Sequence, residues 1–137
     1  MRGRRIAFDY GDVRIGVAVC DPDGILASPL PALKSQDKSL FNSIGTLIDE
    51  YLPVKVFVGL PVNMSGTEGD SAEKAKSFAD ALTEQFRIEV VLIDERLSTV
   101  SAQRKLKEAG VSSRDSKEMI DSMAAVAILE QGLLSEG

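Results

Sequence analysis

The chain of 137 residues contains no histidine and no tryptophan, and it has a single cysteine. Without histidine, catalysis by Ser–His or Cys–His pairs is excluded, and so are zinc or iron sites that need imidazole ligands. Cys20 alone cannot form an intrachain disulfide or a thiolate cluster, so a reducing compartment, the cytoplasm, is expected. The chemistry that remains uses carboxylates, hydroxyls, lysine, arginine and a hard metal ion such as Mg²⁺, which prefers oxygen ligands.

Long apolar runs are also missing. The most apolar segment near the start, residues 15–20, is much too short to cross a bilayer or act as a signal peptide, so no membrane partner is expected. The formal net charge of −5 argues against a protein that coats nucleic acid nonspecifically, because neutralising phosphates requires a basic surface. Residues 96–117 nevertheless contain six basic and two acidic side chains. A solvated helix face is the plain explanation of this basic band, and a contact with nucleic acid is the functional one.

Length and composition suit one soluble domain over residues 1–137, since 44% of the residues are hydrophobic and 27% are charged. Apolar periodicity and turn residues predict, in chain order, strands at 4–10, 13–20 and 24–28, a helix at 39–51, a strand at 54–60, a helix at 70–86, a strand at 89–93, and helices at 99–109 and 116–134. The third strand is expected to be short because Pro29 and Pro31 end it. Three antiparallel strands followed by two strands reached through helical crossovers predict an α/β fold, with a mixed five-stranded sheet and helices on its faces.

Acidic residues occur at three places where packing does not favour charge. Asp9 interrupts an apolar strand, Asp94 and Glu95 directly follow another strand, and Asp121 lies beside the apolar face of the last helix. Each has a plain alternative: a turn cap for Asp9, helix N-terminal acids for the pair, and a border carboxylate for Asp121. If they converge, a divalent cation would relieve their repulsion. Two Mg²⁺ ions about 4 Å apart can cleave phosphodiesters without histidine, so the combination indicates a metal-dependent nuclease.

Four sequence blocks follow one another along nearly the whole chain: FDYGDVRIGVAVCD at 8–21, VGLPVNMSGTEG at 58–69, IDERLSTVSA at 93–102 and IDSMAAVAIL at 120–129. In this order and at this length, the chain resembles the YqgF-like (RuvX) family of bacterial proteins. The resemblance implies an RNase H-like fold. It also implies an endonuclease that either processes the 5′ end of precursor 16S rRNA or resolves Holliday junctions in DNA.

The resemblance implies Asp9, Glu95 and Asp121 as the catalytic acids that bind one or two Mg²⁺ or Mn²⁺ ions. Many RNase H-like nucleases carry an acid at the end of the fourth strand, but VFVGLP has none here, so the second acid must come from the later DER block. Side-chain alternation says only that Asp94 and Glu95 face opposite ways. Glu95 is the prediction, and Asp94 stays open as the alternative.

Five further residues are candidates for contacts with the nucleic-acid backbone: Arg14, Asn63, Ser65, Thr67 and Arg96. The arginines would bind phosphates, and ion pairs within the protein are their plain alternative. The three polar residues lie in a segment where Gly59, Gly66 and Gly69 are expected to supply turn conformations. A structured loop that opens the next helix would account for this segment equally well.

The leading hypothesis is therefore a magnesium-dependent endonuclease that acts on structured RNA, in particular a ribosomal RNA precursor. A junction resolvase would apply the same chemistry to branched DNA and would need a dimer with paired sites. Nothing in the sequence marks a dimer interface, so a monomer and a homodimer both remain open. An actin-like or sugar-kinase ATPase also carries Asp-x-Gly after a first strand, but those enzymes need two such domains. A non-catalytic nucleic-acid-binding module is disfavoured because all three acids are kept.

Overall fold

The computed structural model describes residues 3–61, 69–94 and 113–136, and the side chains of the last segment from Met123 onward. The elements in chain order are β1 (Arg5–Tyr10), β2 (Arg14–Cys20), β3 (Ala27–Lys34), α1 (Leu40–Tyr51), β4 (Lys55–Leu60), α2 (Asp70–Phe86), β5 (Val90–Asp94) and α4 (Ser113–Glu136). The strands form one sheet in the order β3-β2-β1-β4-β5, antiparallel on the β3 side of β1 and parallel on the β5 side. The predicted mixed sheet of an α/β fold is thus confirmed.

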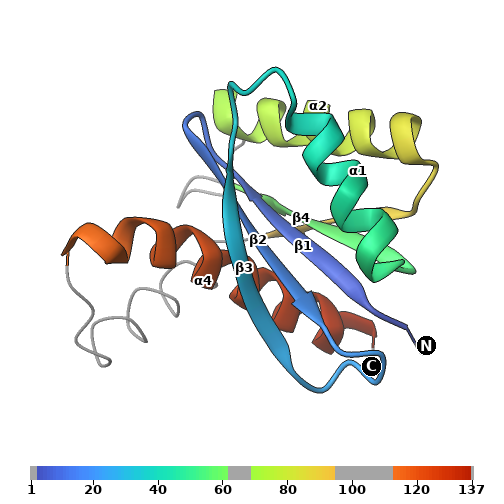
Figure 1. Cartoon of the computed structure of the whole chain (residues 1–137). Helices are drawn as coiled ribbons and strands as arrows, with labels where there is room; N and C mark the ends of the chain where they lie inside the picture. Colours follow the sequence, from blue (N-terminus) through green and yellow to red (C-terminus); the bar gives the residue numbers. More distant parts are fainter. Residues whose placement is uncertain (1–2, 62–68, 95–112, 137) are drawn as a thin grey trace.

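Helices cover both faces of this sheet, α1 and α2 on one face and α4 on the other (Figure 1). Successive side chains of a strand point to opposite faces. On β1, Ile6 and Phe8 therefore pack toward α1 and α2, whereas Ala7 packs toward α4. This alternation holds along β1, β2, β4 and β5 and decides where their side chains project, whereas β3 is interrupted by a register shift between Leu30 and Leu33.

Most element boundaries agree with the prediction, and α2 spans the predicted residues 70–86. The predicted last helix, 116–134, is α4 with a few more residues at each end. Helix α1 ends as expected just before Pro53, with Leu52 in the left-handed conformation at φ 47°. The predicted helix at 99–109 lies outside the described residues.

The third strand was predicted wrongly. β3 runs through Pro29 and Pro31 to Lys34 instead of ending at residue 28. In the described sheet β3 is an edge strand that pairs only with β2, and proline is compatible with an edge strand when its nitrogen faces away from the partner. Both prolines are exposed, and the register between β2 and β3 shifts between Leu30 and Leu33, where Pro31 lies, so the ladder is irregular at this point. Proline is found in sheets at edge strands and at bulges, and β3 offers both.

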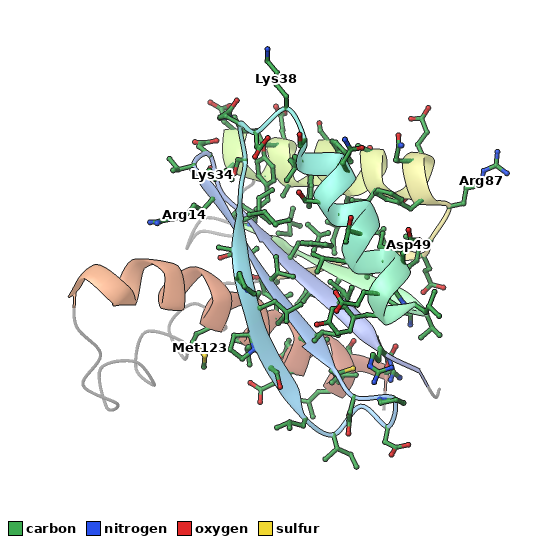
Figure 2. The ribbon with its side chains drawn as sticks, viewed as in Figure 1. Arg14, Lys34, Lys38, Asp49, Arg87 and Met123 are labelled. Atoms are coloured by element: carbon green, nitrogen blue, oxygen red, sulfur yellow. The ribbon has the colours of Figure 1, made fainter. Side chains whose placement is uncertain are left out.

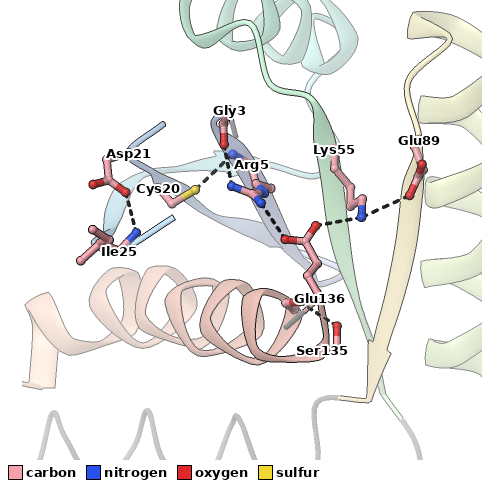
Figure 3. A network of polar contacts seen from close by, with 10 residues as sticks. Gly3, Arg5, Cys20, Asp21, Ile25, Lys55, Glu89, Ser135 and Glu136 are labelled. Atoms are coloured by element: carbon pink, nitrogen blue, oxygen red, sulfur yellow. Dashed lines mark hydrogen bonds and ion pairs between the residues drawn. The ribbon is translucent and has the colours of Figure 1, made fainter. Parts of the chain in front are cut away.

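A partly buried ion network fastens the end of α4 to the start of the sheet (Figure 3). Glu136 accepts a hydrogen bond of 2.7 Å from the Arg5 guanidinium and one of 2.8 Å from Lys55 Nζ. Arg5 is 3% exposed, and Lys55 also lies 3.4 Å from a carboxylate oxygen of Glu89. Burial raises the pKa of the Glu136 carboxyl, but the hydrogen bonds and charges of Lys55 and Arg5 outweigh it, so the net pKa lies below its ordinary value.

Gly132 allows α4 to lie directly against the ring of Phe57, since a Cβ at this position would lie 2.7–2.8 Å from three ring atoms. We expect Gly132→Ala to lower the free energy of unfolding by about 1–2 kcal/mol, because the strain of overpacking exceeds the gain in helix propensity. Urea unfolding measures this difference. The matched control is Gly45→Ala in α1, whose Cβ would meet the Phe86 ring at an ordinary 3.4 Å and should leave stability unchanged or slightly raised. Equal losses in both variants would contradict the assignment.

Candidate functional site

Asp9 is the fifth residue of β1, and its carboxylate projects from the face of the sheet that α4 covers. Ala7, two residues earlier, belongs to the cluster packed under α4, so alternation places Asp9 on the same face. Asp9 is partly buried near the carboxyl end of β1. β4 runs parallel to β1, so their carboxyl ends lie at the same edge of the sheet, where ligands of α/β proteins usually bind.

The two strands that flank Asp9 present glycines beside it on this face. Gly16 of β2 is the residue paired with Asp9. On β4, Val58 pairs with Phe8, so Gly59 is the next residue along and faces α4 like Phe57. Neither of these neighbours carries a side chain beside the carboxylate. The expectation that Gly59 forms a turn was wrong, because Gly59 lies inside β4 and pairs with Ile93.

The side-chain alternation of β5 bears on which residue, Asp94 or Glu95, is the second metal ligand. Val91 and Ile93 pack in the cluster under α4, so Asp94 projects from the opposite face of the sheet. Asp94 therefore does not share a face with Asp9, which argues against the alternative that it is the second metal ligand. Glu95, the predicted ligand, lies outside the described residues.

Position 121 lies in α4, the helix that covers the face carrying Asp9. It precedes Ala125 by four residues and Ile128 by seven, and both of these residues are fully buried against the sheet. α4 ends at Glu136 beside Arg5, the first residue of β1, and its earlier turns lie farther from that end (Figure 1). The helix thus runs against the direction of β1, and its first half lies toward the end of β1 that carries Asp9.

Arg14 is the one predicted backbone-binding residue whose side chain is described, and it faces α4 like Asp9. Ala18 and Cys20 of β2 pack under α4, so Gly16 and Arg14 share their face. Asn63, Ser65, Thr67 and Arg96 lie outside the described residues. The basic band at 96–117 has no described side chain either.

The described side chains include no group of three histidine, cysteine, aspartate or glutamate residues that could hold a metal ion. Of the three predicted acids, only Asp9 has a described side chain. A partly buried carboxylate fits a hard cation in its chemistry, because Mg²⁺ prefers oxygen ligands. The sequence predicts Asp9 as a site residue but gives no sign that Gly16 is its neighbour. Only the register between β1 and β2 reveals that pairing.

The chain matches the family model described as "RuvX: Holliday junction resolvase" over residues 3–135. A relative from Streptomyces avermitilis named "Putative pre-16S rRNA nuclease" is 45% identical over 137 residues, covering 98% of this chain and 88% of that protein. A relative of the same name from Mycobacterium ulcerans is 48% identical over 134 residues, covering 96% and 79%.

Solved structures show the same fold at much lower sequence identity. RuvC from Thermus thermophilus in complex with a Holliday junction substrate matches with a TM-score of 0.61 and 12% identity, covering 98% of this chain and 95% of that chain. No described helix is both long and apolar enough to cross a membrane. The RNase H-like fold and the nuclease class expected from the sequence are confirmed, and the chain belongs to the RuvX family.

Proposed function

We propose that this chain is a divalent-metal-dependent endonuclease that processes the 5′ end of precursor 16S rRNA. Its relatives at 45–48% identity carry the name of that activity. The observation that supports the proposal most is the position of Asp9, a partly buried carboxylate between Gly16 and Gly59 on the face covered by α4. A cytoplasmic location and a single RNase H-like domain over residues 1–137 belong to the same proposal.

In this proposal Asp9, Glu95 and Asp121 hold one or two Mg²⁺ or Mn²⁺ ions. When bound, such ions supply Lewis-acid stabilisation of the charge that develops on the phosphate during cleavage. Asp9 contributes a carboxylate fixed by strand geometry, and Gly16 and Gly59 carry no side chain beside it. Arg14 and Arg96 bind phosphates, and Asn63, Ser65 and Thr67 bind the sugar–phosphate backbone.

A magnesium titration tests this proposal. We expect cleavage of a precursor 16S rRNA fragment to rise with Mg²⁺ concentration to saturation, and to disappear in excess EDTA. Gel analysis of a 5′-labelled fragment measures the rate and the position of the cut. Mature 16S rRNA of the same 5′ region is the control substrate. Equal cleavage with and without EDTA would contradict the dependence on a divalent ion.

The second candidate function is resolution of Holliday junctions in DNA, which the description of the matching family model favours. Resolution needs two symmetric cuts and therefore a dimer with paired sites. A labelled four-way DNA junction, tested beside the RNA fragment in the same buffer, separates the two functions. Paired cuts in the junction without RNA cleavage would replace the proposed substrate, and sedimentation would then be expected to show a dimer.

A further inference from the structure

Helices α1 and α2 cover the face of the sheet opposite to Asp9, and aromatic rings connect the two helices (Figure 1). The ring centroid of Phe41 in α1 lies 6.4 Å from that of Phe78 and 6.5 Å from that of Phe86, both in α2. Phe78 is 5% exposed, and its centroid lies 5.0 Å from that of Tyr10 in β1. Phe41, by contrast, is 36% exposed. The rings therefore form a continuous aromatic surface that reaches the solvent at Phe41.

Two hollows share the side chain of Phe41. The first has a volume of about 570 Å³, and its aromatic lining consists of Tyr10, Phe41 and Phe78. The second has a volume of about 320 Å³ and is lined by Phe41, Ala81, Glu84 and Gln85. Because Phe41 lines both hollows, they are parts of one groove between the two helices, the α1/α2 groove.

One face of α2 runs along the whole groove. The α2 residues that line it recur at intervals of three or four, the spacing of a single helix face: Asp70, Glu73, Ser77, Ala81 and Glu84. Small residues, Ser77 and Ala81, occupy the centre of this face, and acids occupy both ends. Small side chains let a second helix approach closely. The 17 residues of α2 extend over about 25 Å, so a partner helix of about four turns matches the length of the groove.

The helices that form the groove are acidic. α1 and α2 together contain six acidic side chains and two basic ones. Lys74 is the one basic residue among the described residues that line the groove, and its Nζ lies 2.9 Å from Oδ1 of Asp12. Lys38 precedes α1 and Arg87 follows α2, and both side chains extend away from the helices (Figure 2). The groove therefore presents a negative potential to a ligand.

Stabilisation of the helix ends does not account for this charge. Asp70 and Glu73 lie in the first turn of α2, where the helix dipole favours acids. Glu84 lies in the last turn of α2, however, and neither α1 nor α2 has a basic residue in its last turn. Asp49 and Glu50 occupy the same unfavourable position in α1. Acids at these carboxyl-terminal ends cost helix stability, and binding of a cationic partner gives them a functional explanation.

We propose that the α1/α2 groove docks a basic amphipathic helix of another protein. The apolar side chains of that helix cover Phe41 and the small residues of α2, and its lysines or arginines pair with the acids at both ends of the groove. Nucleic acid is disfavoured because the acids repel phosphates, and a second copy of this chain is disfavoured because its own α1 and α2 carry the same charge. The groove lies on the face opposite to Asp9, so the proposal does not depend on the nuclease function.

Binding of a synthetic peptide tests the proposal. The probe is a fluorescently labelled amphipathic helix of about 15 residues, with leucine on one face and lysine on the other. We expect a dissociation constant in the micromolar range, measured by fluorescence anisotropy. A scrambled peptide of the same composition keeps the charge but lacks the apolar face, and it should bind at least about tenfold more weakly. Equal affinity for the two peptides, or no binding of the amphipathic one below about 100 μM, would overturn the proposal.

Phe41→Ser and Ile25→Ser locate the apolar contact. Phe41→Ser should raise the dissociation constant of the amphipathic peptide about fivefold or more, because aromatic side chains in a groove dominate binding energy. Ile25 lies between β2 and β3, is 82% exposed and does not line the groove, so Ile25→Ser should leave binding unchanged. Thermal unfolding verifies that both variants fold. Equal effects of the two substitutions would refute a specific contact at Phe41.

Glu73→Gln tests the charge without disturbing the aromatic packing. It should weaken peptide binding about twofold at low salt and reduce the salt dependence, since one exposed ion pair is lost. The matched control is Glu130→Gln, which removes an exposed carboxylate from α4 on the other face of the sheet. It should leave the peptide affinity unchanged. Identical salt dependence in Glu73→Gln and the unmodified protein would contradict charge pairing in the groove.

Two further measurements distinguish other occupants. Sedimentation that shows a dimer in the unmodified protein and a monomer in Phe41→Ser would place a second copy of the chain in the groove and overturn the proposal. Weaker binding of a precursor 16S rRNA fragment by Phe41→Ser would assign the groove to nucleic acid, with the same consequence. Unchanged RNA binding together with weaker peptide binding in Phe41→Ser would support a separate protein-docking surface.

Discussion

Asp9→Asn is expected to lower the rate of RNA cleavage by at least about 1,000-fold, equivalent to about 4 kcal/mol of transition-state stabilisation. Asparagine keeps the shape of aspartate but removes the negative charge with which Asp9 is proposed to hold a cation. The fold should persist, because the position is only partly buried and its ladder neighbour is a glycine. Single-turnover cleavage at saturating RNA measures the loss, and thermal unfolding verifies the fold.

Binding of Mg²⁺ gives a second readout that does not depend on activity. A ligand that binds only the folded state raises the melting temperature, so Mg²⁺ should stabilise the unmodified protein and not Asp9→Asn. Asp94→Asn is the matched control: it is the same substitution near the end of β5, on the opposite face of the sheet. We expect it to keep both cleavage and the Mg²⁺ effect. Normal cleavage by Asp9→Asn, or a greater loss in Asp94→Asn, would refute the site.

Glu136→Gln is expected to destabilise the fold by about 3 kcal/mol, because it leaves two cations at the start of the sheet without their shared carboxylate. Arg5 is 3% exposed, and the side chain of Glu136 itself is 17% exposed. Urea unfolding measures the change. The control is Glu89→Gln, which removes a carboxylate that is 61% exposed and 3.4 Å from Lys55. That exposed pair should contribute less than about 1 kcal/mol. Similar losses in the two variants would contradict a special role for Glu136.

The same network predicts a pH dependence on the acid side. The pKa of Glu136 in the folded protein lies below the ordinary 4.5, so its contribution is complete above that value and is lost as pH falls through the lower folded pKa. Lys55, whose pKa is raised chiefly by its hydrogen bond to Glu136, titrates only in the alkaline range. We therefore expect the stability difference between the unmodified protein and Glu136→Gln to shrink as pH drops below about 4. Unfolding curves between neutral and acid pH measure it, and a constant difference would argue against the ion network.

Local patterns in the sequence were sufficient for most elements. The helical spacing of Ala72, Ala75, Ala79 and Leu82 predicts α2. The structure confirms it, since all four residues are buried. β3 could not be predicted from its own residues, since prolines are acceptable there only because the strand is at an edge. The position of a strand in the sheet is decided by its pairing with segments that are distant in the sequence. Local residue propensity carries no information about that pairing.

At the candidate site, too, some features could be predicted from the sequence and others required the structure. Asp9 could be found from the sequence because a carboxylate in an apolar strand is unusual. The face of the sheet from which Asp9 projects could not be predicted, because it depends on the packing of α4 over Ala7. The comparison of Asp94 with Glu95 likewise needed the burial of Val91 and Ile93, which places Asp94 on the face of the sheet opposite to Asp9. Glu95 and Asp121 stay predictions as metal ligands.

The prolines of β3 limit how two copies of this chain can assemble. Pro29 and Pro31 have no amide donor, and the register of β3 shifts between Leu30 and Leu33, so a strand from a second molecule would find an irregular edge there. Continuation of the sheet from one copy into another is therefore disfavoured at this edge. A pair of molecules cutting a four-way junction symmetrically would have to associate through another surface.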